Sequence, residues 1–351
     1  MALFFARKLI QWHRDNPRPL PWSGEEPNPY RIWISEIIMQ QTRMDQGIHY
    51  YLRFVDAFPT LQSLSGASLD EVMRLWQGLG YYTRARNLHK AARYIDQHLN
   101  GQFPETYEAL LSLPGIGPYS AAAIASFAFG HRHAVVDGNV KRVIARFAGI
   151  YDSIDDSSVH AKIQKLVTGF MTGVPPGIFN QAIMNFGALV CKPKGALCSI
   201  CPMTKECYAF KHKMVDVLPV RSKKKANRDR YFHFFVFHYR GKILLQRREG
   251  KDIWKGLYTP PMVERNSERR ISDDRIRVFT KQFIGHHDIE LTGASSSVRQ
   301  LLSHQTITGR FLYLNLLSSP SPMSEDFVWA SNKTLDVYGK PKMVTQMLGS
   351  P

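Results

Sequence analysis

Cysteine is scarce in this chain and confined to one short segment. The 351-residue sequence has four cysteines, and all of them fall between Cys191 and Cys207. Elsewhere the chain has no thiol that could form a disulfide or act as a nucleophile. Thiols grouped this closely in a reducing compartment usually bind a metal. The sequence therefore predicts a metal centre between these two residues.

Long hydrophobic runs are missing as well. No stretch approaches the roughly 20 apolar residues that a membrane-spanning helix needs. The N-terminal segment is interrupted by Arg7 and Lys8 and lacks a small-residue cleavage pattern, so we expect no signal peptide. We therefore expect a cytoplasmic protein without a membrane partner. Fixed-period repeats and low-complexity tracts are also missing, which excludes solenoid architectures.

Acidic residues are few compared with basic ones. The chain has 29 aspartates and glutamates against 46 lysines and arginines, for a formal net charge of +17. An excess of this size favours a polyanionic partner such as nucleic acid. A basic surface that only maintains solubility is the alternative that charge alone leaves open.

Apolar periodicity divides the chain into a helical part and a mixed part. Residues 1–212 carry apolar side chains at three- and four-residue spacings, which predicts an all-α domain. Residues 213–228 contain the stretch VRSKKK and are typical of a basic linker. Two strand-like runs joined through Arg240 and a helical pattern over 270–285 follow. We therefore predict a multidomain chain whose second domain, residues 229–351, is α+β.

The cysteines have an uneven spacing, C-x6-C-x2-C-x5-C, formed by Cys191, Cys198, Cys201 and Cys207. Zinc sites usually combine two closely spaced pairs, whereas here one pair is that close. Uneven loops suit the separated corners of a 4Fe–4S cluster better, with zinc and unliganded thiols as alternatives. The run has no activated nucleophile, so the cluster is predicted to be structural. Lys192 and Lys194 in its first loop are either phosphate ligands or solvated side chains.

The stretch LPGIGPYSA predicts a helix, a tight turn and a second helix. Gly115 and Gly117 permit a positive φ and a close approach of the backbone, and Pro118 suits a first helical turn. The exposed N–H groups of such a turn can bind one phosphate of a duplex without reading its sequence. A plain corner between two helices is the alternative.

A second turn, in GLGYYTRAR, places aromatic side chains beside arginines. Tyr81 could wedge into a base stack while Arg84 and Arg86 hold phosphates. The alternative is that the tyrosines belong to the core and the arginines to the surface.

Two carboxylates are suited to acid–base work on a glycosidic bond. Glu36 in WISEIIMQQT has apolar neighbours at helical spacing, which raises a carboxyl pKa and favours a general acid. Asp137 follows the extended HAVV and precedes a helix, an N-cap position that keeps a carboxylate ionised. Cleavage of an N-glycosidic bond uses such a pair, one to protonate the leaving base and one to stabilise the sugar cation. A surface glutamate and an ordinary helix cap are the alternatives.

The cysteine run, LPGIG and VVDGNVKRV together resemble the helix-hairpin-helix DNA glycosylase superfamily. Within it, SEIIMQQT and GLGYYTRARNLHKAA resemble the adenine DNA glycosylase (MutY) family. This resemblance implies an all-α glycosylase domain with an iron–sulfur cluster loop. It also implies double-stranded DNA as the partner, with adenine opposite 8-oxoguanine or guanine as the substrate, a monomer, and a place at the bacterial nucleoid.

The resemblance also implies roles for individual residues. Glu36 would protonate adenine at N7, and Asp137 would lie under the sugar. The remaining positions that match the family are the active-site Asn139 and Tyr119, the inserted Gln41 and Tyr81, and Lys141 near the sugar. Members that cleave the DNA strand carry a lysine where this chain has Tyr119, so an enzyme without efficient lyase activity is expected. A glycosylase/lyase for oxidised pyrimidines and a catalytically silent DNA-binding protein are the alternatives.

The second domain resembles the Nudix-like C-terminal domain of the same family, through KILLQRREGKDIWKGLYTPP and LLSHQTITGRFLYLNL. A hydrolysing Nudix domain needs an acidic cassette for Mg²⁺, which VERNSERRISDD lacks. The domain should therefore bind rather than hydrolyse, although a pyrophosphatase remains the third alternative. The resemblance implies that Ser303 and His304 recognise 8-oxoguanine; their alternative is a structural role.

Overall fold

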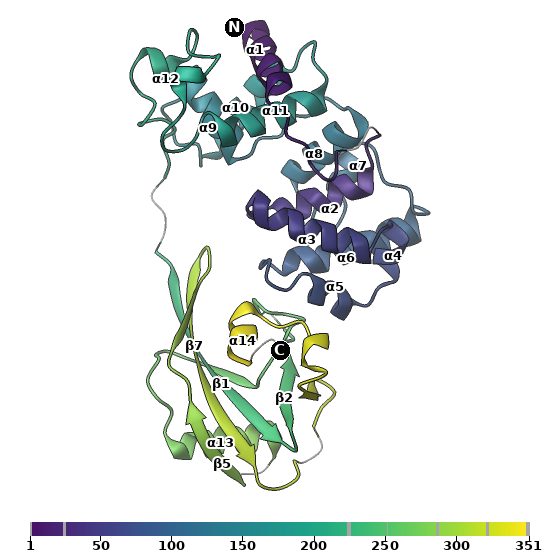
Figure 1. Cartoon of the computed structure of the whole chain (residues 1–351), viewed down its shortest axis with the longest axis vertical. Coiled ribbons are helices and arrows are strands. Elements are labelled where there is room, and N and C mark those ends of the chain that lie inside the picture. The colour runs from purple at the N-terminus through teal and green to yellow at the C-terminus, as the bar shows by residue number, and fades with distance from the viewer. Residues whose placement is uncertain are drawn as a thin grey trace. The chain divides into compact units, whose positions relative to one another are not determined.

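The computed structural model describes residues 2–23, 26–222, 226–250, 252–285, 288–320 and 323–348. The chain forms two compact units (Figure 1). The first comprises Met1–Ser65 and Lys90–Lys223, and the second comprises Gly66–His89 and Lys224–Pro351. Residues 223–225 of the predicted linker lie outside the described residues. The predicted boundaries at 212 and 229 stay a prediction.

The first unit is helical, as the apolar periodicity predicts. The helices that lie wholly or partly in it are α1 (Ala2–Asp15), α2 (Pro29–Met39), α3 (Met44–Ala57), α4 (Leu61–Gly66), α6 (Thr83–His98), α7 (Tyr107–Leu111), α8 (Pro118–Phe129), α9 (Gly138–Ala148), α10 (Ser157–Phe170), α11 (Pro176–Leu189), the 3-10 helix η1 (Cys198–Ile200) and α12 (Tyr208–Lys211). None of the helices in the described part of the chain combines the length and apolar character needed to cross a membrane.

Local sequence signals explain where these helices begin and end. The side chain of Asn28 accepts a hydrogen bond from Arg31 N at 3.1 Å and caps α2, while Pro29 occupies its first turn. Gly130 and Gly149 end α8 and α9 with φ of +68°. The stretch from Pro29 to Ala57, which has one continuous periodicity, is divided into α2 and α3 because the backbone turns at Gln41 with φ of +56°.

The core of the first unit is built on aromatic side chains. Phe5 of α1 is fully buried, and its ring centroid lies 4.7 Å from that of Phe147 and 4.9 Å from that of Phe170. These contacts join α1, α9 and α10. Burial of each such side chain contributes roughly 1.5–3 kcal/mol to folding. The elements that carry the functional side chains are therefore held on a rigid base.

The second unit is an eight-stranded sheet with helices on its faces (Figure 1). The strands run in the order β3-β2-β1-β7-β5, with β4 paired to β1, β6 to β7 and β8 to β2. The bounds are β1 (Arg228–Tyr239), β2 (Lys242–Arg247), β3 (Tyr258–Thr259), β4 (Met262–Arg265), β5 (Ile289–Ala294), β6 (Val298–Leu301), β7 (Gln305–Leu316) and β8 (Phe327–Ser331). The helices are α5 (Leu69–Leu75), α13 (Asp273–Ile284), the 3-10 helix η2 (Leu335–Val337) and α14 (Lys342–Leu348).

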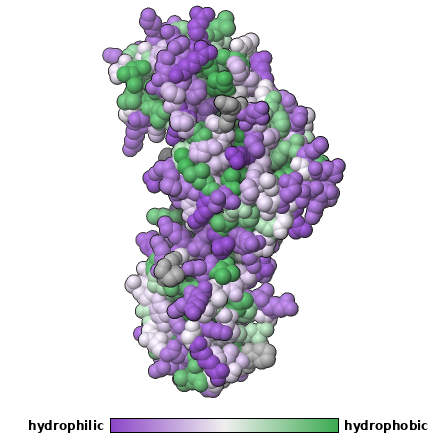
Figure 2. All heavy atoms as spheres, turned by 45° about the vertical axis from the view of Figure 1, so that its right-hand side comes forward, coloured by the Kyte–Doolittle hydropathy of each residue, from purple (hydrophilic) through white to green (hydrophobic). Residues whose placement is uncertain are grey.

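The predicted strand pair on either side of Arg240 is confirmed as β1 and β2, and the predicted helix within 270–285 is α13. Alternation along β1 directs Phe235 and Phe237 to the face covered by α13. It directs Phe234 to the other face, where its ring stacks on Phe311 at 4.4 Å. On the side of the molecule visible in Figure 2, hydrophobic residues are scattered among hydrophilic ones.

Candidate active site

The two predicted catalytic carboxylates line one cavity of the first unit. This cavity has a volume of about 460 Å³, and Glu36, Tyr119 and Asp137 all contribute to its wall. Glu36 comes from the last turns of α2, Tyr119 from the first turn of α8, and Asp137 from the N-cap of α9. Three helices far apart in sequence therefore bring an acid, a phenol and a second acid to one place.

The carboxyl group of Glu36 is shielded from water. Its helix neighbours Trp33 and Ile37 are buried. Desolvation raises the pKa of Glu36 to about 7, a hydrogen bond with Tyr119 opposes the rise, and the nearby charge of Asp137 adds to it. A carboxylic acid with this pKa is protonated in half of the molecules at neutral pH, so it can donate a proton.

Asp137 differs from Glu36 in its hydrogen bonds. Its two oxygens accept from Val140 N and from Asn139 Nδ2, each at 2.7 Å. Burial raises the pKa of Asp137, and the hydrogen bonds from Val140 and Asn139 offset part of that rise. The donors nevertheless stabilise the ionised form, and Glu36 lacks such backbone donors.

Tyr119 and Lys141 occupy different surroundings. The Tyr119 hydroxyl also donates to Met184 Sδ at 3.7 Å, and burial together with the two carboxylates raises its pKa. Lys141 is not among the residues that line the cavity, and its Nζ donates to Ile154 O at 2.8 Å. The predicted proximity of Lys141 to the sugar stays a prediction. Among the described residues, none of those that line the cavity is a lysine.

A buried arginine that the sequence analysis did not single out holds Asn139 in place. Arg142 is 5% exposed, and its Nη2 donates to Asn139 Oδ1 at 2.9 Å and to Gly187 O at 2.7 Å. Its Nε donates to Cys191 O at 2.7 Å. Since the Asn139 oxygen is engaged by Arg142, its amide nitrogen must face Asp137. Arg142 thus links the first cysteine to the aspartate through one amide.

Gly187 makes this arrangement possible. A Cβ atom at this position would lie 2.7 Å from Asn139 Cβ and 3.1 Å from Asn139 O. Any larger residue would therefore push α11 away from α9. The glycine permits the close approach that brings Gly187 O within reach of Arg142.

A second buried arginine, one turn further along α9, binds the cysteine loop. Arg146 is 3% exposed, and its Nη1 donates to Cys191 Sγ at 3.4 Å and to Lys192 O at 2.7 Å. Its Nε donates to Leu218 O at 2.8 Å. The guanidinium group therefore ties the start of the cysteine loop to α9.

The four cysteines are half-buried and free of disulfides. Cys201 Sγ accepts a hydrogen bond from Met203 N at 3.4 Å. Among the described residues, which include all four cysteines, no three histidine, cysteine or acidic side chains converge as a single metal ion would require. Lys192 and Lys194 lie in the loop between the first two cysteines, and the second is exposed.

The predicted hairpin joins α7 to α8. Gly115 has φ of +77°, as expected, whereas Gly117 caps α8 with φ of −93° and needs no special conformation. A Cβ atom on Gly117 would meet nothing within 4 Å, so the start of α8 is open to a ligand. Pro118 occupies the first turn of α8, as predicted. Gln41 lines the cavity with a strained backbone.

The second predicted turn lies in the second unit. Tyr81 is 45% exposed and has φ of +46°. Arg84 turns inward, where its Nη2 donates to Leu79 O at 3.4 Å and to Gly80 O at 3.3 Å. Arg86 donates to Lys255 O at 2.6 Å and to Thr83 Oγ1 at 2.8 Å. Both arginines therefore support the turn, and their predicted role as phosphate ligands stays a prediction.

Ser303 and His304 line a cavity of about 640 Å³ that the turn 78–83 also lines. The hydroxyl groups of Tyr81 and Ser303 are hydrogen-bonded to each other. Gln77 fixes this turn, because its Nε2 donates to Thr345 Oγ1 and its Oε1 accepts from Lys340 N, both at 3.0 Å. The cavity thus lies wholly within the second unit.

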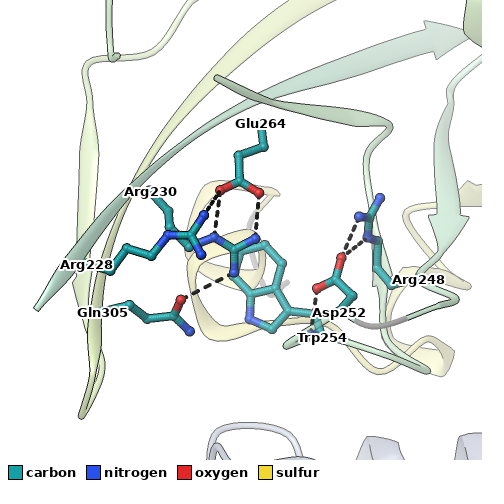
Figure 3. A network of polar contacts seen from close by, with 7 residues as sticks. All are labelled: Arg228, Arg230, Arg248, Asp252, Trp254, Glu264 and Gln305. Atoms are coloured by element: carbon teal, nitrogen blue, oxygen red, sulfur yellow. Dashed lines mark hydrogen bonds and ion pairs between the residues drawn. The ribbon is translucent and has the colours of Figure 1, made fainter. Parts of the chain in front are cut away.

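A network of ion pairs supports the start of β7, the strand that follows the loop with Ser303 (Figure 3). Arg230 forms two hydrogen bonds with the Glu264 carboxylate, at 2.8 Å and 2.6 Å. Its Nη1 donates to Gln305 Oε1 at 3.3 Å, and Arg228 lies 3.9 Å from the same carboxylate. A bidentate pair of this kind fixes orientation as well as position. It therefore anchors the strand end next to His304.

Sequence reasoning missed the buried arginines because their partners are distant in the chain. A signal did exist in NVKRVIARF, where Arg142 and Arg146 occupy positions i and i+4 among buried apolar residues. Charged residues are rarely buried without several partners. Gln77 had no comparable local signal.

Comparisons with known proteins agree with this architecture. The family model of the HhH-GPD superfamily of base excision DNA repair proteins matches residues 34–168, and that of the NUDIX domain matches residues 233–350. The adenine DNA glycosylase of Buchnera aphidicola subsp. Baizongia pistaciae is 36% identical over 269 residues, which are 76% of each chain. That of Rattus norvegicus is 44% identical over 58% of this chain and 41% of its own.

Among solved structures, a thermostable thymine-DNA glycosylase has 27% sequence identity and a TM-score of 0.53. The match covers 60% of this chain and 97% of the other. A non-covalent endonuclease III–DNA complex, at 23% identity, has a TM-score of 0.52, covers 60% of this chain and 95% of its own, and shows the same fold.

The contacts of Arg142 predict a large loss of stability on substitution. Arg142→Lys keeps the charge but cannot reach Asn139 Oδ1, Gly187 O and Cys191 O together. Because charged hydrogen bonds contribute about 1.5–3 kcal/mol each and are not additive, we expect the free energy of unfolding to fall by about 3 kcal/mol. Urea denaturation measures it, with Arg14→Lys at an exposed position of α1 as the control. A fall below about 1 kcal/mol would contradict the assignment.

Proposed function

The chain belongs to the adenine DNA glycosylase family, and from this premise we propose that it excises adenine opposite 8-oxoguanine or guanine in duplex DNA. The reaction is hydrolysis of the N-glycosidic bond, a step of base-excision repair. The observation that carries the proposal is the common cavity of Glu36 and Asp137. A pair of carboxyl groups in different environments is the arrangement that glycosidic cleavage requires.

The environments of the two carboxyl groups assign their roles. Glu36, with a pKa raised to about 7, donates its proton to N7 of adenine and converts the base into a better leaving group. Asp137, with donors on both oxygens, faces the sugar and stabilises its developing positive charge. Asn139 holds the Asp137 carboxylate, and Tyr119 orients Glu36 by its hydrogen bond. Water then attacks the sugar.

Release of the base without strand cleavage follows from the side chains in the cavity. A lyase needs an amine that attacks the sugar carbon, and the described part of the chain places no lysine in the cavity wall. The position in α8 where strand-cleaving relatives of the superfamily carry a lysine is Tyr119. This favours an enzyme with no efficient lyase activity over a glycosylase/lyase for oxidised pyrimidines.

DNA recognition is assigned to the strained and exposed positions. The target base must leave the stack, and a mispair reduces the cost of that step. We propose that Gln41 and Tyr81 are the residues inserted at the lesion pair when the target base leaves the stack. Both have a positive φ and an exposed side chain. The hairpin at Gly115–Gly117 and the exposed Lys194, with Lys192, bind phosphates. Ser303 and His304, in a loop that lines a separate cavity, read 8-oxoguanine.

The cysteine loop suits a 4Fe–4S cluster with a structural role. Four thiols on one loop supply the required ligand set, and the Arg146 and Met203 N–H groups supply the hydrogen bonds that thiolates accept. The uneven spacing of the cysteines along the chain favours a cluster over a zinc site, which usually combines two closely spaced pairs. When bound, the cluster would fix the loop that carries Cys191 O, the acceptor of Arg142.

We propose three functional segments along the chain. Residues 1–212 form the glycosylase domain, 213–228 the basic linker and 229–351 the Nudix-like recognition domain. We propose that the protein acts as a monomer. The substrate places the protein in the cytoplasm, at the bacterial nucleoid.

The proposed acid makes excision dependent on pH. The rate of adenine release from a duplex with adenine opposite 8-oxoguanine should fall as pH rises through about 7, because Glu36 loses its proton there. Glu36→Gln should lower the rate at least about 100-fold and remove that dependence, while DNA binding persists. A duplex with adenine opposite thymine is the control. Excision that is unchanged in the variant would eliminate Glu36 as the acid.

The proposed reader of the lesion predicts a change in preference. Ser303→Ala should reduce the ratio of excision rates for 8-oxoguanine and guanine opposite adenine by about tenfold, the effect of one lost hydrogen bond. The exposed Ser324→Ala is the matched control. Single-turnover rates on both duplexes provide the ratio, and an unaltered ratio would remove Ser303 from recognition.

The proposed cluster predicts a metal content. The purified protein should contain about four iron and four sulfide per chain and be brown. Cys201→Ser should lower both and destabilise the fold, because an iron ligand and the ordering of the loop are lost. Elemental analysis and visible absorption test this. One zinc per chain without sulfide would contradict the assignment.

A further inference from the structure

One face of the second unit carries three arginines in a regular arrangement. The strand register pairs Tyr231 with Arg265 on β4 and with Thr308 on β7, and it pairs Thr308 with Arg299 on β6. Residues paired directly across strands share a face. Arg265, Tyr231, Thr308 and Arg299 therefore form a row across four strands. At roughly 4.8 Å per strand, its ends are about 15 Å apart.

Arg310 lies in the next row of the same face. It is paired with His233, which is two residues beyond Tyr231 on β1 and is 1% exposed. Burial, together with the nearby positive charges of Arg265 and Arg310, lowers the pKa of His233 to about 4. His233 is therefore neutral at physiological pH. We call Arg265, Arg299 and Arg310 the arginine face.

The arginine face has no acidic partners among the described residues. None of its members forms an ion pair there, and Arg310 Nε is buried without a hydrogen-bond partner. Arg265 Nη1 donates to the neutral Arg269 O at 3.0 Å. Asp229, two residues before Tyr231, is the acid that strand alternation places on this side of β1.

The opposite face of the same strands is different. There Arg230 pairs with Glu264 and, near it, Arg248 pairs with Asp252 (Figure 3). Arginines on that face are thus neutralised by the protein itself, whereas those of the arginine face are not. Partly desolvated guanidinium groups without a carboxylate are stabilised by an external anion.

The distance across the arginine face and its position beside the Ser303 loop indicate which anion it binds. Measured along the helix axis, a 15 Å span corresponds to about four base-pair steps of duplex DNA. Arg299 belongs to the hairpin β6–β7, whose connecting loop carries Ser303 and His304. A phosphate held by Arg299 would therefore fix the hairpin that reads the lesion. Contacts of this type position a protein on the duplex.

We propose that Arg265, Arg299 and Arg310 bind the phosphodiester backbone of the DNA strand read by the Ser303 loop. This site rests on the proposed function, which it extends from base recognition to backbone anchoring. Each guanidinium group displaces counterions from the DNA, and the contact carries no base specificity. The arginine face supplies affinity and orientation, and the cavity of Glu36 and Asp137 supplies the chemistry.

The salt dependence of binding tests the arginine face. A triple Arg→Gln variant at 265, 299 and 310, in the full chain, is titrated with a duplex containing adenine opposite 8-oxoguanine. Glu36→Gln serves as the background to prevent cleavage. Over 50–200 mM salt, the slope of log K against log salt should become less negative by about 2 to 3, or about 0.9 per lost contact. The single variant Arg299→Gln, at an exposed position, should change it by about 0.9.

A second triple variant controls for net charge. Arg240, Lys242 and Lys333 are exposed in the same unit, and the first two lie at the other end of β1. Their replacement by glutamine removes the same charge and should change the slope by less than about 0.5. Equal slopes for the two triple variants would overturn the proposal. An unchanged slope for Arg299→Gln in a folded protein would overturn it as well.

Two further measurements separate the possible outcomes. Inorganic pyrophosphate, titrated as a competitor, tests for a free-nucleotide site. If the triple variant loses pyrophosphate binding while its DNA slope is unchanged, the arginine face is such a site and the proposal fails. Adenine release by the unmodified chain tests the proposed function separately. Release together with an unchanged slope contradicts only the arginine face, whereas a changed slope without release contradicts only the proposed reaction.

Discussion

The hydrogen bonds of Arg142 are the interaction on which the catalytic geometry depends. One buried guanidinium group binds oxygens from α9, from α11 and from the start of the cysteine loop. Since Asn139 accepts from Arg142 and donates to Asp137, the orientation of the carboxylate is linked to the position of Cys191. The cysteine loop and the candidate active site are therefore parts of one hydrogen-bonded structure, although the chain between them runs through α9, α10 and α11.

Burial and hydrogen bonding divide the work between the two carboxyl groups. Both have raised pKa values because both are desolvated. Asp137 accepts from Val140 N and Asn139 Nδ2, which stabilise negative charge, whereas Glu36 shares a hydrogen bond with Tyr119 in largely apolar surroundings. One group is thus suited to release a proton and the other to remain charged. A single cavity can hold both because the two groups belong to different helices.

Local patterns predicted much of the fold and the site. Patterns of a few adjacent residues were enough to predict the cap at Asp137, the apolar neighbours of Glu36 and the hairpin glycine Gly115. The inward turn of Arg84 was not predictable, because its acceptors depend on how the chain bends at Gly80. The assignment of residues 66–89 to the second unit likewise depends on contacts such as that of Gln77 with Thr345, which are 268 positions apart. Long-range packing of this kind leaves no periodic signature in either segment.

The left-handed backbone of Gln41 and Tyr81 has a consequence for how the protein meets its substrate. A non-glycine residue in this conformation is held there by its surroundings at a cost of about 1–3 kcal/mol. The folded state bears that cost before any ligand arrives. The two side chains are consequently presented in advance, and binding need not order them at the expense of affinity. Most replacements at these positions would favour an ordinary backbone conformation, and the side chain would then be less rigidly held.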